Sequence, residues 1–245
     1  MIRGWSAVYF REMLILRRRL FRLISAWSVS PLLYLIAFGY AMGKGISIQG
    51  HTYIEFLIPG LAAMSSMTQS FAIGSEINIA RFYWHIFEEF QAAPISNTAY
   101  VLGEVLAGMT RALLAGCVIL VLGALFDVVL SYGPSFWLAF LLNSLIFSSL
   151  AVGLAMLIKS HADQAMVTSF VITPMAFLGG TFFPIEHLPH WAQIILCWLP
   201  LTHAANAIRA SSFNEAPQFS NYLILVSLGI LAFVFAVMTV NRARD

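Results

Sequence analysis

The residues best suited to chemistry are three charged side chains within or beside long apolar stretches. Glu76 lies near the end of one stretch, and Glu104 and Arg111 lie in the next. A charge near mid-membrane costs at least ~2.5 kcal/mol on insertion scales, so it normally faces protein or water. Glu104 and Arg111 are seven residues apart, close to two turns, and share a helix face. We expect these three residues to form an interhelical polar cluster that stiffens the cytoplasmic gate. Alternatively, Glu76 and Glu104 snorkel to the interface and Arg111 is simply paired. Neither interpretation makes them substrate ligands.

Two further stretches resemble known binding motifs only in part. "GYAMGKG" (39–45) has three residues, not four, between its first two glycines. Gly45 stands where a phosphate-binding loop needs a hydroxyl group for magnesium. "EHLPH" (186–190) holds one carboxylate and two imidazoles, but prolines break its helical geometry and no other ligand set accompanies it. No Gly-x-Ser-x-Gly elbow occurs. We therefore expect no catalytic residue, no cofactor site and no metal site.

The composition is that of an integral membrane protein. Of 245 residues, 60% are hydrophobic and 10% are charged, with a mean hydropathy of +0.84. Soluble domains carry about 25% charged residues. A net charge of +2 gives no support to nucleic-acid binding. Cys117 and Cys197 are too few and too far apart for a disulfide framework or a metal site. We expect no cleaved signal peptide, because the first residues lack a short apolar run ending in a small-residue cleavage site.

Six stretches are long and apolar enough to cross a bilayer, which takes roughly 20 helical residues. They are Leu23 to Met42, Phe56 to Ile77, Val101 to Phe126, Phe136 to Ile158, Met166 to Phe183, and Tyr222 to Val240. A seventh apolar piece, residues 191–199, is too short to cross. Gly179, Gly180 and Pro184 end the fifth span early, which favours a re-entrant segment at the outer face before the sixth span. We expect one all-α polytopic domain over residues 1–245, without internal repeats.

Six spans place both termini on one side, and the basic residues indicate which side that is. Ten of them lie on the side of the termini: Arg3, Arg11, Arg17, Arg18, Arg19, Arg22, Arg81, Lys159, Arg242 and Arg244. Only Lys44 and Arg209 lie on the other side. By the positive-inside rule, both termini are expected to be cytoplasmic.

The N-terminal stretch before the first span has the periodicity of an amphipathic helix. Its apolar residues recur at helical spacing: Trp5, Val8, Tyr9, Met13, Leu16 and Leu20. Arginines recur on another face. A basic amphipathic helix of this kind is expected to lie on the cytoplasmic leaflet, where arginine attracts anionic head groups. A topology signal alone would explain the arginines but not the apolar face.

The segment "RFYWHIFEEFQAAPIS" (81–96) is an amphipathic, acidic insert between the second and third spans. By the topology above it is cytoplasmic. Its spacing favours a short helix with aromatic and acidic side chains. From the residues alone, two interpretations are equally supported: a docking element for a soluble partner, or a solvated loop that only connects two spans.

Three blocks together resemble the ABC-2 type transporter permeases. They are "YIEFLIPGLAAMSSMTQSF" (53–71), "FEEFQAAPISNTAYVLGEVLAG" (87–108) and "FLGGTFFPIEHLPHWAQIILCWLPLTHAANAIR" (177–209). The blocks keep the family's order and spacing, and the resemblance covers essentially the whole chain. It is greatest to bacterial permeases that export drugs, polysaccharides or lipooligosaccharides.

The resemblance implies a permease subunit in the cell inner membrane that pairs with a second copy or a related permease. Two separate ATPase subunits would hydrolyse ATP and drive export. In this family the segment between spans two and three is the coupling helix, here roughly Ile79 to Ile95, which contacts the ATPase. The expected contact residues are Phe82, His85, Glu88, Glu89 and Phe90.

Polar residues within the spans are candidates to line a pathway. The family pattern implies a cavity at the dimer interface, lined mainly by spans one, two and five. The candidates are Thr68, Gln69, Thr168 and Thr173. Hydrogen bonds between packed helices would explain these residues nearly as well.

Two other classes of function remain open at this stage. A secondary carrier driven by an ion gradient usually has internal repeats and ionisable residues at the midplane. Here repeats are missing and Arg111 is the one deeply placed charge. The third class is a membrane anchor that transports nothing.

Overall fold

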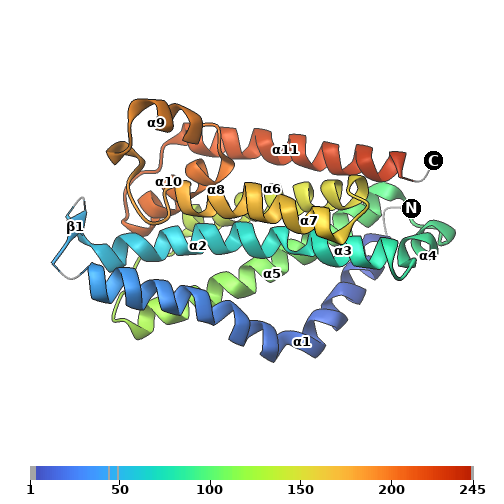
Figure 1. The fold of residues 1–245 in the computed structure, drawn as a ribbon, viewed down its shortest axis with the longest axis horizontal. Coiled ribbons are helices and arrows are strands. Elements are labelled where there is room, and N and C mark those ends of the chain that lie inside the picture. Colours follow the sequence, from blue (N-terminus) through green and yellow to red (C-terminus); the bar gives the residue numbers. More distant parts are fainter. Residues whose placement is uncertain (1–3, 44, 49, 244–245) are drawn as a thin grey trace.

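The apolar stretches form long helices that lie side by side along one common direction (Figure 1). The structure is a computed structural model that describes residues 4–43, 45–48 and 50–243. The long helices are α1 (Trp5–Tyr34), α2 (Tyr53–Phe71), α3 (Ile73–Phe82), α5 (Asn97–Leu125), α6 (Pro134–Leu157) and α11 (Phe219–Arg242). Helix α6 packs against α2, α5, α10 and α11, so it is the central element of the bundle.

Shorter elements connect the long helices. They are η2 (Leu35–Met42), α4 (Ile86–Ala92), α7 (His161–Val167), η3 (Thr168–Ile172), α8 (Thr173–Leu178), η4 (Ile185–His187), α9 (His190–Leu196) and α10 (Pro200–Ser212). Strands β1 (Ser47–Ile48) and β2 (His51–Thr52) pair antiparallel as a small hairpin. The predicted all-α polytopic fold is confirmed, since this hairpin is the sole sheet among the described residues.

Five helices in the described part of the chain are long and apolar enough to cross a membrane. They are Trp5–Ala41, Tyr53–Phe82, Asn97–Leu125, Pro134–Leu157 and Phe219–Arg242. The predicted span at 166–183 corresponds to α7, η3 and α8, a run from His161 to Leu178 that a π-helical segment interrupts. A total of six spans therefore stays a prediction, as does the outer re-entrant segment, where the structure has η4, α9 and α10.

Local sequence signals account for several helix starts. Thr52 and Glu55 form a reciprocal capping box at the start of α2, in which the Glu55 carboxylate accepts from the Thr52 backbone N–H at 2.7 Å. Ser96 caps α5, because its hydroxyl accepts from Ala99 N at 3.3 Å. Pro134 occupies the first turn of α6, where its missing N–H costs nothing.

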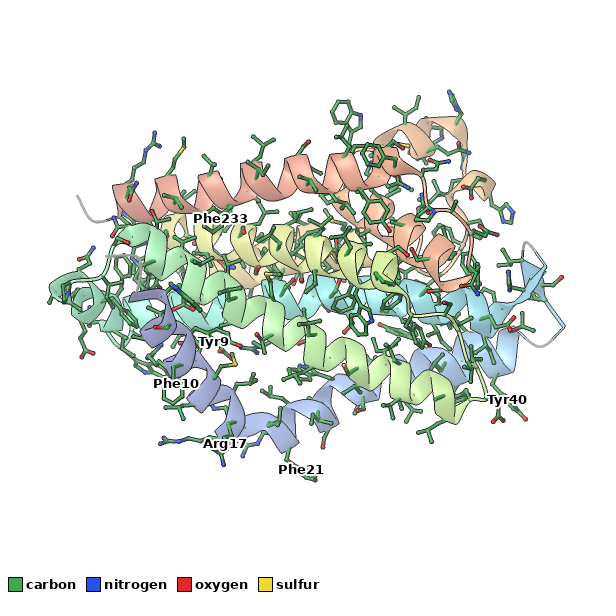
Figure 2. The ribbon with its side chains drawn as sticks, turned by 180° about the vertical axis from the view of Figure 1, so that it is seen from behind. Tyr9, Phe10, Arg17, Phe21, Tyr40 and Phe233 are labelled. Carbon is green, nitrogen blue, oxygen red and sulfur yellow. The ribbon has the colours of Figure 1, made fainter. Side chains whose placement is uncertain are left out.

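The predicted N-terminal helix and first span form one helical run, α1 followed by η2, and α1 bends sharply near Phe21 (Figure 2). The Ser25 hydroxyl donates to Phe21 O at 3.0 Å, and the Ser28 hydroxyl donates to Ile24 O at 2.7 Å. Such bonds back to the carbonyl four residues earlier often bend helices. The first arm packs on α5, with Val8 fully buried. Contact with protein therefore explains part of its apolar periodicity, and its position at the membrane interface stays a prediction.

Close approach of α1 and α5 depends on Gly103. A Cβ at this position would lie 2.7 Å from Val8 Cβ, well inside contact distance. Next to this contact, the Tyr9 hydroxyl and the Thr110 hydroxyl lie 3.0 Å apart. The small residue lets the two backbones meet, as small residues do in membrane helix pairs.

The start of α1, the end of α11 and α4 lie at the same end of the bundle, the α4 end (Figure 1). Asn97 Nδ2 donates to Asn241 Oδ1 at 2.8 Å, which joins α5 to α11 there. Asn78 Nδ2 donates to Ile158 O at 2.7 Å, so Lys159 belongs to the same end. The hairpin and α9 lie at the opposite end, the hairpin end (Figure 1). Arg209 belongs to this end as well, because its guanidinium lies over the ring of Phe56 in the first turn of α2. Three of the basic residues used to predict the membrane orientation lie outside the described residues: Arg3, Lys44 and Arg244.

Candidate functional site

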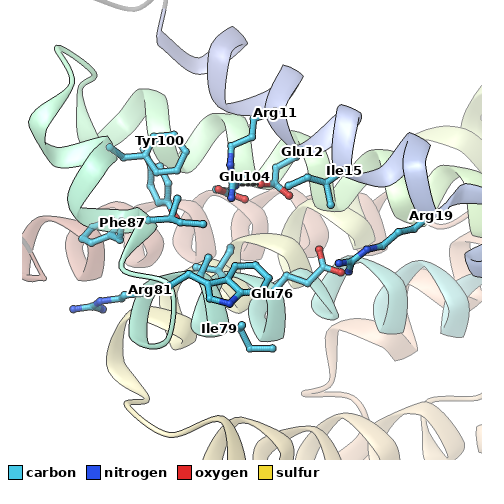
Figure 3. Close-up of a pocket in the computed structure, with 15 residues that line it drawn as sticks. Arg11, Glu12, Ile15, Arg19, Glu76, Ile79, Arg81, Phe87, Tyr100 and Glu104 are labelled. Carbon is cyan, nitrogen blue, oxygen red and sulfur yellow. Dashed lines mark hydrogen bonds and ion pairs between the residues drawn. The ribbon is translucent and has the colours of Figure 1, made fainter.

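A cavity of about 210 Å³ opens at the α4 end between α1, α3, α4 and α5 (Figure 3). We call it the α4-end cavity. Three carboxylates line it, from Glu12, Glu76 and Glu104. Its other walls are largely apolar and aromatic, formed by Trp84, Ile86, Phe87, Phe90 and Tyr100 among others. Arg11, Arg19 and Arg81 also line it, so the cavity combines apolar and aromatic walls with both acidic and basic groups.

The predicted polar cluster is present in part. Arg111 Nη1 lies 2.6 Å from Glu76 Oε2, so the ion pair joins α5 to α3. Glu104 is only 2% exposed, and its Oε2 atom is buried without a hydrogen-bond partner among the described residues. Although Glu104 and Arg111 share a helix, Glu104 points instead toward the side chains of α1 (Figure 3).

Two residues of this cluster were missed by the sequence reasoning. Arg11 pairs with the buried Glu12 on α1. Figure 3 shows the Arg11 side chain reaching down between Glu12 and Glu104. The sequence did contain an indication of this pair, since Glu12 is the single acidic residue in an arginine-rich amphipathic stretch. The position of Glu12 beside Glu104 of α5 depends on long-range packing, so it could not be inferred from the sequence.

The short helix α4 is held against the bundle by its aromatic side chains. The Phe87 ring is 6% exposed and meets Tyr100 edge-on at 5.4 Å between centroids. Phe90 meets the same tyrosine at 5.3 Å, and the Arg11 guanidinium lies 5.5 Å from the Phe90 ring. Aromatic pairs with this spacing and tilt are favourable beyond the area that they bury. These contacts fix α4 to α1 and α5.

Arg81 anchors the other side of α4. Its Nη1 donates to Met156 O on α6 at 2.6 Å. Its guanidinium also lies 4.8 Å from the Phe82 ring and 5.2 Å from the Phe87 ring, within cation–π range. A displacement of α4 would therefore reach α5 through Tyr100 and α6 through Arg81.

The predicted docking residues divide into an outer and an inner group. His85, Glu88 and Glu89 are exposed, and His85 Nδ1 lies 3.2 Å from Glu88 Oε1. Phe82 and Phe90 are half-buried, and Phe90 packs against the core of the bundle. Two exposed aromatics were missed, Tyr83 and Trp84, although aromatic residues in a segment outside the spans are a visible signal.

Three of the four predicted pathway residues line one groove of about 270 Å³. Thr68 and Gln69 come from α2, and Thr173 comes from α8. The opposite wall is α1, with aromatic groups contributed by Trp27, Tyr34 and Phe177 of α8. Thr168 is not part of this lining, and its hydroxyl donates to Gln164 O at 3.2 Å. We call this the α1–α2–α8 groove.

Arg209 lies at the hairpin end, where it contacts the Gly179–Gly180 turn and α2. It is buried, donates from Nη2 to Gly180 O at 2.6 Å, and its guanidinium lies 3.8 Å from the Phe56 ring centre. Burial lowers the pKa of Arg209 to about 10, while nearby Glu186 acts in the opposite direction. The side chain is therefore still charged at neutral pH. It clamps the Gly179–Gly180 turn onto α2.

Comparison with known proteins decides the family. The model of a family described as ABC-2 type transporter matches residues 3–213. The chain belongs to the ABC-2 type transporter family. All three sequence blocks that carried the resemblance lie within this match.

Named relatives of this ABC-2 chain are bacterial. The inner membrane transport permease YadH of Escherichia coli K12 is 26% identical, over 88% of this chain and 86% of the relative. Nodulation protein J of Rhizobium meliloti is 32% identical, over 84% of this chain and 80% of the relative. Nodulation protein J of Neorhizobium galegae is 29% identical, over 98% and 94%.

Proposed function

We propose that this chain is the membrane subunit of an ATP-driven exporter in the bacterial inner membrane, with both termini cytoplasmic. Two permease chains, identical or related, would form the pathway, and two separate ATPase subunits would bind at the α4 end. Family membership and the transport-permease relatives support the transport role. The charge distribution supports the orientation, because Arg11, Arg81 and Arg242 lie at the α4 end.

The observation that carries the ATPase-docking part is the two-sided construction of α4. One side is fixed to the bundle by Phe87 and Phe90, and the other presents Glu88, Glu89 and His85 to solvent. A rigid attachment with an exposed charged face can transmit a partner's movement. A loop that only connected two spans would need neither feature.

The α1–α2–α8 groove supports a route for substrate. It combines the Thr68, Gln69 and Thr173 polar groups with aromatic walls, a lining suited to amphiphilic molecules. Its position on the surface of one chain agrees with a pathway that a second permease copy completes.

Co-purification of the chain with a candidate ABC ATPase subunit tests this proposal. We expect wild type to retain the ATPase, and Glu88→Arg/Glu89→Arg to lose at least tenfold of it while still inserting in the membrane. The matched control is Asp127→Arg/Glu215→Arg, which reverses two exposed acids at the hairpin end. Equal retention by all three proteins would overturn the docking role of α4.

A further inference from the structure

The bend of α1 carries arginines whose charge is not balanced within the described part of the chain. Arg17, Arg18 and Arg22 are all exposed, and none of the three forms an ion pair or a side-chain hydrogen bond with any residue that the structure describes. Glu12 is the one acidic residue of α1, and it is buried and paired with Arg11. The charged side chains that α1 exposes at the bend are therefore all positive.

Three of these arginines are spaced to act together. Arg18 and Arg22 are four residues apart, so they lie on one face of the helix, and Arg17 is next to Arg18. Two guanidinium groups one turn apart can both donate to the oxygens of one phosphate, since each presents a planar fork of N–H donors. Arg19 lines the α4-end cavity instead (Figure 3). We call Arg17, Arg18 and Arg22 the bend patch.

The bend patch lies where the chain enters the bilayer. Arg22 directly precedes the apolar run that starts at Leu23 and belongs to a helix long enough to cross a membrane. Charge within the hydrocarbon layer is costly, so these long side chains reach toward the polar head groups. Figure 2 shows Arg17 directed toward the α4 end and Phe21 directed away from the bundle. The phosphate layer on the α4 side of the bend is therefore within reach of the patch.

Exposed apolar side chains beside the patch favour a lipid over a soluble partner. Phe10, Leu14 and Phe21 are 64%, 42% and 87% exposed. The apolar residues on the other side of this arm, Val8 and Leu16, are buried against α5. A phospholipid offers a phosphate to the arginines and acyl chains to the exposed rings at the same time. An acidic protein surface would match the arginines only.

We propose that the bend patch is a binding site for anionic phospholipid, in which Arg18 and Arg22 donate to the phosphate, Arg17 adds positive charge at the head group, and Phe21 contacts the acyl chains. A zwitterionic lipid fits less well, because α1 exposes no acidic side chain to receive its ammonium group. The proposal concerns this chain alone and does not rest on the transport function. It also differs from the orientation rule, which counts basic residues and does not distinguish between lipids.

Photolabelling of the purified chain in phosphatidylcholine nanodiscs tests this site. The probe is phosphatidylglycerol with a diazirine in the acyl chain close to the glycerol, added at low mole fraction. Its matched control is phosphatidylcholine with the same acyl chain. We expect phosphatidylglycerol to label peptides containing residues 20–24 about fivefold more than the control lipid, since one arginine near the surface already contributes roughly that factor.

Two charge-matched variants show whether the patch or the total charge is responsible. Arg18→Gln/Arg22→Gln should bring the two lipids to equal labelling of residues 20–24. Lys159→Gln/Arg242→Gln removes two exposed basic residues at the same end of the bundle and should leave the preference unchanged. Both variants keep most of the basic residues that orient the chain, so both should insert. The proposal is overturned if wild type is labelled equally by both lipids, if Arg18→Gln/Arg22→Gln keeps the wild-type preference, or if the control variant loses it to the same extent.

Discussion

The rings of Phe87 and Tyr100 meet edge to face, 5.4 Å apart between centroids, and join α4 to the first turn of α5. Both side chains are buried, at 6% exposure each. This one contact links the exposed segment around Glu88 to a helix that runs the length of the bundle (Figure 1). It is the structural basis for treating α4 as a transmitting element.

Removing the Phe87 ring should release α4. Phe→Ala changes in cores cost about 3–5 kcal/mol, and because α4 is a short peripheral helix, we expect local opening before global unfolding. Hydrogen exchange and limited proteolysis of Phe87→Ala should show loss of protection confined to residues 83–96. Phe21→Ala, at a ring 87% exposed, is the control and should change neither readout. Unchanged protection in Phe87→Ala would contradict the anchoring role.

Substitutions of Glu76 and Arg111 should have non-additive effects on the free energy of unfolding, because the two side chains form an ion pair. Glu76→Gln leaves the buried Arg111 guanidinium without its carboxylate, and we expect a loss of about 1–3 kcal/mol in the free energy of unfolding. The double variant Glu76→Gln/Arg111→Met should be more stable than Glu76→Gln alone, because it leaves no unpaired charge. Thermal unfolding in detergent measures all four proteins of the cycle. Additive losses would mean that the pair is not coupled.

We expect a larger side chain at position 103 to weaken the contact between α1 and α5 and so to lower the stability of the protein. In Gly103→Val, the new side chain collides with Val8, and overpacking of this kind costs about 1–3 kcal/mol. Adding Val8→Ala to that variant should recover part of the loss. Gly133→Ala is the matched control, since a Cβ there meets nothing closer than 4.0 Å. The measurement is the midpoint of thermal unfolding, and equal midpoints for Gly103→Val and Gly133→Ala would contradict the contact.

We expect both the planar shape and the charge of the Arg209 side chain to contribute to the stability of the protein. Arg209→Met should lose about 1.5–3 kcal/mol of stability, because it removes a charged hydrogen bond to Gly180 O. Arg209→Lys keeps the charge but loses the planar stack on Phe56, so it should restore only part of that stability. Thermal unfolding distinguishes the three proteins. Full rescue by lysine would show that the stack contributes nothing.

Hydrophobic runs were sufficient to predict most of the membrane helices. The expected spans at 101–126, 136–158 and 222–240 match α5, α6 and α11 closely, because each is a long run of mostly apolar residues. The fifth expected span was harder to predict. Its polar and proline-containing stretch forms an interrupted run in which hydrogen bonding departs from the α pattern at η3.

The candidate site was predictable only as far as local spacing reaches. The Glu76–Arg111 pairing follows from the cost of isolated charge in the membrane. The position of Glu12 beside Glu104 does not, since it depends on how the bent helix α1 folds back onto α5. Burial of Phe87 but exposure of Trp84 likewise follows from the packing of α4 on Tyr100.

Site-specific crosslinking tests the central claim most directly. A photoreactive amino acid at position 88 would be compared, in membranes that also contain the candidate ATPase subunit, with the same group at position 198 of the hairpin end. The account predicts a crosslink to the ATPase from position 88 and none from position 198. Absence of the crosslink at position 88, with both proteins present and the permease inserted, would contradict the assignment of α4 as the docking helix.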